Sequence, residues 1–271
     1  MSTKLEKHID IESPQVILDS LKNNIELSKQ QLKKLMQNGS VWLENSHGIQ
    51  RVRRAKKSLH AGDKLHIYYN EEIQTAQPSG AHLIADEGGY SIWNKPCGMY
   101  SQGTKWGDHC TIYRWAEKNL MPQRPAFIVH RLDKAANGLM IIAHTKKLAA
   151  SFSKLFEQRN INKTYKATVE GIVKNLNLPY EIKNQLDNKL AISEIIAIKI
   201  DNNNLQTELE IKIKTGRKHQ IRRHLSAMGH PIIGDRLYGA KNIQQDLQLS
   251  SVELSFVCPL TLQQKKYSLK N

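Results

Sequence analysis

Hydrophobic and polar positions follow two different spacings along this chain. Helical spacing relates Leu148, Ala149, Phe152, Leu155 and Phe156, which predicts a helix over residues 146–159 with its aromatic side chains in a core. Shorter patterns predict helices over residues 111–120 and 219–228, and strands over residues 89–94, 127–129, 139–142, 165–169, 190–200, 205–214 and 251–257. This series favours the α+β class, with a large, mainly antiparallel sheet and a few helices, over a regular βαβ alternation.

The first part of the chain has a smaller α/β pattern. A helix is predicted from Ser28 to Gln37, because Ser28 and Gln31 form a capping-box pair and Gly39 follows the last turn. Its apolar stripe contains three residues: Leu32, Leu35 and Met36. Strands are predicted over residues 41–43 and 65–69, and a polar linker over residues 70–80. We therefore expect two domains, a small α/β domain over residues 1–77 and a larger one over residues 78–271.

The charge of the chain is strongly positive, since 40 Lys and Arg residues against 25 Asp and Glu residues give a net charge of +15. Such an excess favours a polyanionic partner, either a nucleic acid or an anionic membrane surface. No apolar run of about 18 residues is present, and residues 1–7 lack the apolar segment of a signal peptide. An odd set of 3 cysteines is typical of free thiols in a reducing cytosol. We expect a cytoplasmic protein that binds nucleic acid and no membrane.

One carboxylate stands between cations on a loop that joins two apolar runs. Asp133 lies on this loop, and Gly138 follows where the chain must turn back, which a residue without Cβ permits. Arg131 and Lys134 favour the ionised carboxylate, which suits a nucleophile or a base. The alternative is an ordinary surface turn in which Asp133 forms an ion pair.

Four motifs occur in order along the larger part of the chain. The first is N-K-P-C-G at residues 94–98, and the second is H-R-L-D-K-A-A-N-G-L at residues 130–139. The third is K-T-Y-K-A-T-V-E-G at residues 163–171. The fourth begins with T-G-R-K-H-Q-I-R-R-H-L at residue 215 and continues through G-H-P-I-I-G-D to Y-G at residues 238–239. Together they resemble the motifs of the RluA-type family of RNA pseudouridine synthases.

This resemblance implies the fold of that family and an isomerase that converts uridine to pseudouridine in RNA. Asp133 becomes the catalytic carboxylate, which attacks the sugar, attacks the base or removes a sugar proton. The target base must leave its stack to reach such a residue. Tyr165 would hold the extruded uracil with its ring and offer a hydroxyl for proton transfer. Arg222 would form the ion pair with Asp133, and Arg217 is the alternative partner.

No cofactor is expected, because the reaction oxidises nothing and donates no group. Four histidines could suggest a metal site: His130, His219, His224 and His230. The chain has neither H-E-x-x-H nor C-x-x-C, so we expect no metal. Lys95 and Asp235 stand beside Pro96 and Gly234, and we interpret both pairs as structural turns.

Contacts with RNA are expected in both parts of the chain. In the larger part the resemblance assigns Arg131 the place of the flipped base, and it adds Arg217 and His219 as RNA contacts. In the first part the candidate phosphate contacts are cations on the helix and on the run that follows: Lys29, Lys33, Lys34, Arg51, Arg53, Arg54, Lys56 and Lys57. A solvated charged face is the alternative for these cations.

The stretch from Leu27 to Leu65 also resembles the S-four-type RNA-binding module. Its N-G-S-V corner at residues 38–41 and its G-D corner at residues 62–63 match well, and its arginine-rich middle matches loosely. The catalytic candidates lie within residues 94–239. We therefore expect removal of residues 1–77 to weaken RNA binding and to spare the single-turnover rate.

Substrate and function class leave alternatives open. Ala136 and Asn137 stand where the RluA-type family usually has Thr and Ser, which affects substrate choice more than activity. An RNA-binding or RNA-chaperoning protein without turnover is the second class, and the presence of Asp133, Tyr165 and Arg222 favours the enzyme. We expect a monomer that acts on structured RNA, with ribosomal RNA favoured over tRNA.

Overall fold

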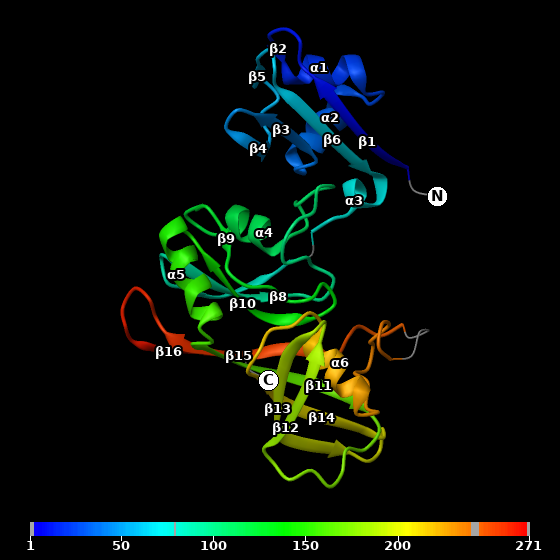
Figure 1. Cartoon of the computed structure of the whole chain (residues 1–271), viewed down its shortest axis with the longest axis vertical. Coiled ribbons are helices and arrows are strands. Elements are labelled where there is room, and N and C mark those ends of the chain that lie inside the picture. The colour runs from blue at the N-terminus through cyan, green and yellow to red at the C-terminus, as the bar shows by residue number, and fades with distance from the viewer. Residues whose placement is uncertain (1–2, 79, 240–243, 270–271) are drawn as a thin grey trace. The chain divides into compact units, whose positions relative to one another are not determined.

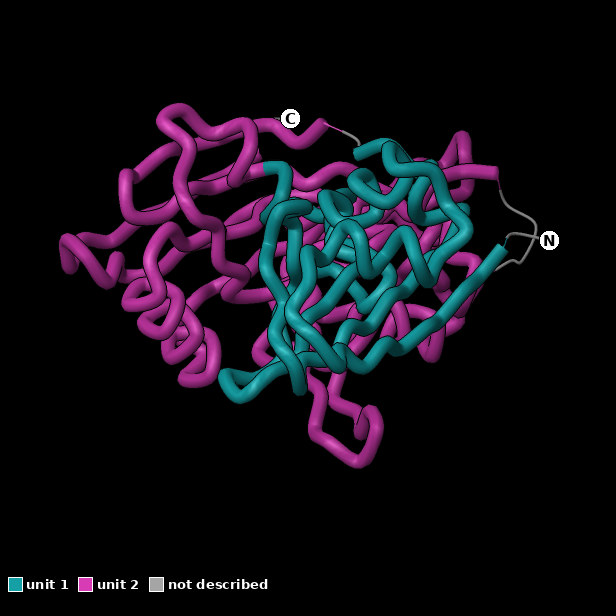
Figure 2. The backbone as a smooth tube through the Cα atoms, turned by 90° about the horizontal axis from the view of Figure 1, so that it is seen from above, with its two compact units in different colours: residues 1–79, 102–115 teal, residues 80–101, 116–271 magenta. Residues whose placement is uncertain are grey.

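The computed structural model describes residues 3–78, 80–239 and 244–269, and the chain folds into two compact units. The first unit contains residues 1–79 and 102–115, and the second contains residues 80–101 and 116–271 (Figure 2). The domains expected from the sequence differ from these units in one segment. Residues 102–115 follow the first strands of the second unit in sequence. They nevertheless pack with the first unit, because their hydrogen-bond partners belong to that unit.

Four antiparallel strands form the sheet of the first unit, in the order β1 (Lys4–Asp10), β6 (Lys64–Asn70), β3 (Val41–Asn45) and β4 (Gly48–Arg51). The helices are α1 (Ile17–Asn24), α2 (Lys29–Gln37) and the short α3 (Glu71–Thr75), and β2 (Gln15–Val16) pairs with β5 (Ser58–Leu59) (Figure 1). The helix predicted after Ser28 is confirmed, with the capping box to Gln31 formed in both directions. Its apolar stripe is buried in one core with Val41 and Leu65.

The segment 102–115 covers the other face of this sheet. Alternation along the strands turns Trp42 and Tyr68 away from the core. The Trp42 indole Nε1 donates a hydrogen bond to the carbonyl of Lys105 (3.2 Å), and the Ser40 hydroxyl donates one to the carbonyl of Trp106 (2.7 Å). The Lys105 ammonium lies 4.8 Å from the centre of the Tyr68 ring. The segment is therefore an integral part of the first unit.

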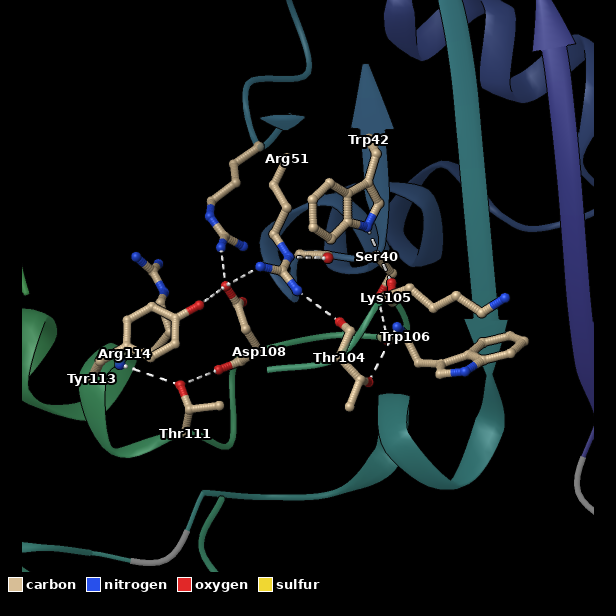
Figure 3. A network of polar contacts seen from close by, with 12 residues as sticks. Ser40, Trp42, Arg51, Thr104, Lys105, Trp106, Asp108, Thr111, Tyr113 and Arg114 are labelled. Atoms are coloured by element: carbon tan, nitrogen blue, oxygen red, sulfur yellow. Dashed lines mark hydrogen bonds and ion pairs between the residues drawn. The ribbon is translucent and has the colours of Figure 1, made fainter. Parts of the chain in front are cut away.

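Asp108 anchors this segment (Figure 3). Its side chain is only 1% exposed, and its Oδ2 accepts a hydrogen bond from Arg53 Nη2 at 2.5 Å and another from the Tyr113 hydroxyl. Arg51 Nη1 lies 3.6 Å from the same oxygen. The Asp108 backbone N–H donates to the carbonyl of Asn38 at 2.9 Å. A buried carboxylate with these partners fixes the segment in place.

The second unit is built on a ten-stranded sheet, in which eight strands follow the order β12 (Tyr180–Leu186), β13 (Lys189–Asp201), β14 (Gln206–Ile213), β11 (Ile161–Glu170), β15 (Leu249–Val257), β10 (Asn137–Ala143), β8 (Tyr90–Lys95) and β7 (His82–Asp86). The other two are β9 (Phe127–Ile128), beside β10, and β16 (Gln264–Ser268), beside β15. The helices are α4 (Ile112–Asn119), which begins in the segment 102–115, α5 (Lys146–Glu157) and α6 (Gln220–Ala227). The pair β10–β15 is parallel and its neighbours are antiparallel, so the predicted α+β class is confirmed.

Aromatic side chains of α5 pack into the core of the second unit, as predicted. The Phe152 ring lies 5.0 Å from that of Tyr90 and 5.4 Å from that of Phe256, both edge to face. Phe156 stacks on His130 with ring centres 4.5 Å apart. The prediction of a buried strand over residues 127–129 was wrong in one respect, since β9 is short and only half-buried.

Candidate active site

The loop that carries Asp133 joins β9 to β10, and its return depends on Gly138. This glycine has a φ of +114°, and a Cβ there would lie 2.3 Å from the carbonyl oxygen of Ser251 on β15. Only glycine allows this conformation and this close approach of the parallel strands. His130, just before Asp133, ties the start of the loop to β10, because its Nε2 accepts a hydrogen bond from the N–H of Ile141 at 2.9 Å. Burial lowers the pKa of His130 to about 3, so it is a neutral support and no proton donor.

A second segment, residues 95–101, holds the backbone of the same loop. The ammonium of Lys95 is fully buried and donates hydrogen bonds to the carbonyls of Ala136 (2.6 Å), Pro96 (2.9 Å) and Met99 (3.0 Å). Burial lowers the pKa of Lys95 to about 8, although the charges of Cys97 and Asp133 oppose the shift. This buried cation therefore ties the loop to the end of β8. Lys95 was interpreted as part of a structural turn, but it is the last residue of β8, and its buried ammonium has a structural role.

Arg222 of α6 joins Asp133 to a second carboxylate. Its Nη1 donates to Asp133 Oδ2 at 3.3 Å, while Nε and Nη2 each donate to Asp235 at 2.7 Å. Arg222 and Asp235 are buried, at 4% and 1% exposure. Burial opposes ionisation of Asp235, but hydrogen bonds from Arg222 and from the N–H groups of Leu237 and Tyr238 outweigh it and hold its pKa below the ordinary value. Asp235 thus fixes the guanidinium, a role that the turn-like G-D pair did not reveal.

The formal charges of this group do not cancel. One guanidinium is shared by two carboxylates, so the triad of Arg222, Asp133 and Asp235 has a net charge of −1. The Asp133 side chain is 27% exposed, and its Oδ1 faces His219 Nε2 at 3.7 Å. Burial lowers the pKa of His219 more than the Asp133 charge raises it. Asp133 is therefore oriented by a cation without being neutralised by it.

Asp133 lies at the wall of a cavity of about 370 Å³, within the range of small-molecule sites. Its lining includes Cys97, Asp133, His219, Arg222, Leu237 and Asp246. Tyr165, on β11, is only 7% exposed. Burial, and next the charge of Asp133, raise the pKa of Tyr165 above its ordinary value, so its hydroxyl stays protonated. Asp133 and Arg222 thus line this cavity, and Tyr165 lies close enough for the charge of Asp133 to act on its hydroxyl.

Two other residues predicted for this site lie differently. Arg217 Nε donates to the carbonyl of Leu190 at 3.0 Å, so Arg222 and not Arg217 pairs with Asp133. Arg131 has an exposed side chain on the loop that carries Asp133. Across residues 3–78, 80–239 and 244–269, no group of 3 or more His, Cys, Asp or Glu side chains could hold a metal ion. None of the described helices has both the length and the apolar character of a membrane span.

The cations predicted to bind RNA in the first unit fall into two sets. Arg51 and Arg53 use their guanidinium groups inside the unit, on Asp108 and on the carbonyls of Gly39 and Gln37. The others have exposed side chains: Lys29, Lys33, Lys34, Arg54, Lys56 and Lys57. Arginine-rich spacing could not separate the sets, because Asp108 lies more than fifty residues away.

Comparisons with known proteins agree with this geometry. The sequence model of a family described as RNA pseudouridylate synthase matches residues 89–227. A relative from Aquifex aeolicus, described as an uncharacterized RNA pseudouridine synthase, is 30% identical over 249 residues, which cover 84% of this chain and 77% of the relative. The dual-specificity RNA pseudouridine synthase RluA of Vibrio vulnificus is 32% identical over 186 residues, or 61% of this chain and 73% of the relative. The solved human RNA pseudouridylate synthase domain containing 1 shares the fold, with a TM-score of 0.59, 18% identity and coverage of 72% of this chain and 86% of that one.

Proposed function

The chain belongs to the RNA pseudouridylate synthase family, whose members are isomerases that act on RNA, and we propose that it isomerises specific uridines in structured RNA through Asp133. The observation that supports this role best is the placement of Asp133 at the cavity wall, held by Arg222 at 3.3 Å and still partly exposed. A partly exposed carboxylate facing a cavity can attack a substrate or accept a proton without first losing one of its own.

The reaction keeps every atom of the nucleotide. The bond between the sugar C1′ and the uracil N1 breaks, the base turns, and C1′ bonds to C5, which loses its proton while N1 gains one. Asp133 supplies the carboxylate that acts on sugar or base, and the Tyr165 hydroxyl, which is almost fully buried, is proposed to transfer a proton. No electrons are exchanged with another molecule, so we propose that the enzyme works without a cofactor or a metal.

The target uridine must reach this cavity as an unstacked base. The cavity lies within the second unit and would accept an extruded nucleotide more readily than a paired one. Arg131 is exposed next to Asp133 and is proposed to fill the space that the flipped base leaves, while Arg217 and His219 contact the flanking RNA. Extrusion is easiest at strained or unpaired positions, which favours structured RNA with loops.

The first unit is proposed to hold the RNA by its phosphates. Its exposed cations are candidates for these contacts: Lys29, Lys33, Lys34, Arg54, Lys56 and Lys57. Arg51 and Arg53 are retained only as weaker candidates, because their donors are used within the unit. The resemblance to the S-four-type module stays a prediction. Replacing Lys29, Lys33 and Lys34 by Ala should weaken binding and flatten its salt dependence, and Lys22→Ala on α1 is the matched control.

Ribosomal RNA is our preferred substrate over tRNA, because a separate basic unit suits a large RNA with many phosphate contacts. The enzyme is proposed to act as a monomer in the cytoplasm, where its three cysteines stay reduced. Light scattering of the purified protein measures its oligomeric state, and a dimer would contradict the first of these statements.

Release of tritium from RNA labelled at uracil C5 tests the reaction directly. Transcripts of ribosomal RNA and tRNA are incubated with wild type and with Asp133→Asn, and pseudouridine is then mapped. Release by wild type alone supports the proposal, and the map identifies the RNA. Binding without release from any RNA would support the second function class, an RNA-binding protein without turnover.

A further inference from the structure

Ser101 lies at the end of the segment that follows β8, far from Asp133 in sequence and close to it in space. It is 5% exposed. Its hydroxyl donates a hydrogen bond to the carbonyl of Leu132 at 2.6 Å and accepts one from the N–H of Leu132 at 3.0 Å. Leu132 directly precedes Asp133, so one side chain holds both backbone groups of the residue before the carboxylate.

These two bonds complete a support that acts on both sides of Asp133. On the far side, the Gly98 N–H donates to the carbonyl of Lys134 at 2.9 Å, and Lys95 donates to the carbonyl of Ala136. On the near side, Ser101 fixes the Leu132 carbonyl, which belongs to the same rigid peptide plane as the Asp133 N–H. The direction of the Asp133 side chain is therefore set by its backbone as well as by Arg222.

The contact with Arg222 alone is a weak constraint on this direction. Its distance of 3.3 Å is long for a charge-assisted hydrogen bond, and the same guanidinium binds Asp235 by two bonds of 2.7 Å. Asp133 could thus drift while Arg222 stays with Asp235. Backbone support is what keeps the carboxylate at the cavity wall.

We propose that Ser101 is a positioning residue for Asp133. Ser101 touches no substrate and acts through Leu132, although its hydroxyl also lies 3.6 Å from Met140 Sδ. The proposal rests on the isomerase function proposed above. Without the hydroxyl, the buried N–H and carbonyl of Leu132 lose their partner, and the loop must shift to find others. A displacement of about 1 Å at a catalytic group lowers a rate by roughly 10²-fold.

The test compares Ser101→Ala with Ser101→Thr and with a matched control, Ser91→Ala. Ser91 lies on β8, is fully buried and also makes two side-chain hydrogen bonds, with His144 Nε2 at 2.8 Å and Trp93 Nε1 at 2.7 Å, but it does not contact the catalytic loop. Both alanine variants should have a lower melting temperature than wild type. Single-turnover rate at saturating RNA, RNA affinity and melting temperature are measured for each.

We expect Ser101→Ala to lose about 10²-fold in rate with RNA affinity changed by a few fold, and Ser101→Thr to recover most of the rate. Ser91→Ala should keep the wild-type rate. Equal rates for Ser101→Ala and wild type, or equal rate losses in Ser101→Ala and Ser91→Ala, would overturn the proposal and leave the isomerase intact. If wild type releases no tritium from any RNA, the proposed function fails, and the positioning role fails with it.

Discussion

Asp108 and Asp133 are both carboxylates paired with arginine, yet their surroundings differ in two respects. Asp108 has a side chain that is 1% exposed and lies beside two arginines, which leaves a net charge of +1. Asp133 is 27% exposed and shares one arginine with Asp235, which leaves a net charge of −1. The first can only hold structure, because nothing can reach it. The second keeps both its charge and its access to a cavity, and these are what chemistry needs.

The largest expected effect comes from removing the carboxylate of Asp133. Asp133→Asn should lower turnover by on the order of 10⁴-fold, because the neutral amide is a poor nucleophile and base. RNA affinity should stay within a few fold, since phosphate contacts supply most of the binding. Tritium release and filter binding measure the two quantities. Multiple turnover by the variant, with deamidation excluded by mass spectrometry, would contradict the assignment.

The next largest loss of rate is expected from replacing Arg222, which pairs with Asp133. Arg222→Met leaves Asp235 buried without its counterion, which costs about 3–5 kcal/mol of unfolding free energy, and it frees Asp133 as well. Arg217→Met removes a half-buried side chain whose hydrogen bond goes to the Leu190 carbonyl and not to Asp133, so it should change the rate far less. Urea unfolding and single-turnover rates compare the variants. A larger rate loss in Arg217→Met would reverse the roles of the two arginines.

Removing the hydroxyl of Tyr165 should have a smaller effect on the rate. Tyr165→Phe keeps the ring, so RNA affinity should be unchanged, and it removes a proton donor, so the rate should fall by about 10²-fold. Single-turnover measurements at saturating RNA separate the two. Identical rates for Tyr165→Phe and wild type would remove the hydroxyl from the mechanism.

Raising the pH should lower the single-turnover rate through Lys95, which supports the loop of Asp133 and not Asp108. Lys95 is protonated below its pKa of about 8 and neutral above it, and its ammonium holds the loop of Asp133 through the Ala136 carbonyl, besides the carbonyls of Pro96 and Met99. Deprotonation weakens this support, so the single-turnover rate should fall by up to about tenfold for each pH unit above that pKa. RNA affinity at each pH is the control. A rate that stays level from neutral pH to about pH 9.5 would show that the charge of Lys95 has no part in catalysis.

The smallest effect on the rate is expected from replacing the buried carboxylate of Asp108. Asp108→Asn leaves Arg51 and Arg53 without their counterion and should cost about 2–3 kcal/mol of unfolding free energy while the single-turnover rate stays near wild type. Asp10→Asn, whose side chain is 78% exposed and pairs with Lys64, is the matched control and should change neither quantity. A large loss of rate at full stability in Asp108→Asn would end the distinction between the two carboxylates.

Local patterns predicted the elements of this fold better than the support around its site. The cap of α2, the aromatic face of α5 and the strands on either side of Asp133 depend on neighbouring residues, so their spacing shows them. β1 and β12 escaped prediction because their side chains are mostly exposed and lack an apolar alternation. The pairing of Arg222 with Asp133 came from the resemblance to a family.

The contacts of Asp235, Ser101 and Asp108 could not be predicted from local sequence. Ser101 and Leu132 are 31 positions apart, and Asp108 and Arg53 are 55 apart. Nothing in a short window marks such a partner, and a buried aspartate in a turn has the same spacing as an exposed one. Burial, which turns these polar residues into supports, is a property of the folded chain alone.

The split of the first unit between residues 1–79 and 102–115 has a consequence for synthesis. A growing chain presents β1 to α3 first, and Asp108 emerges only after the first two strands of the second unit. At ~5–20 residues per second this interval lasts a few seconds. During it, Arg51 and Arg53 have no counterion, and Trp42 has no carbonyl to bond. The nascent N-terminal part therefore lacks these contacts although its apolar core lies within residues 9–69, and a gene truncated to end at residue 77 should yield a less stable protein.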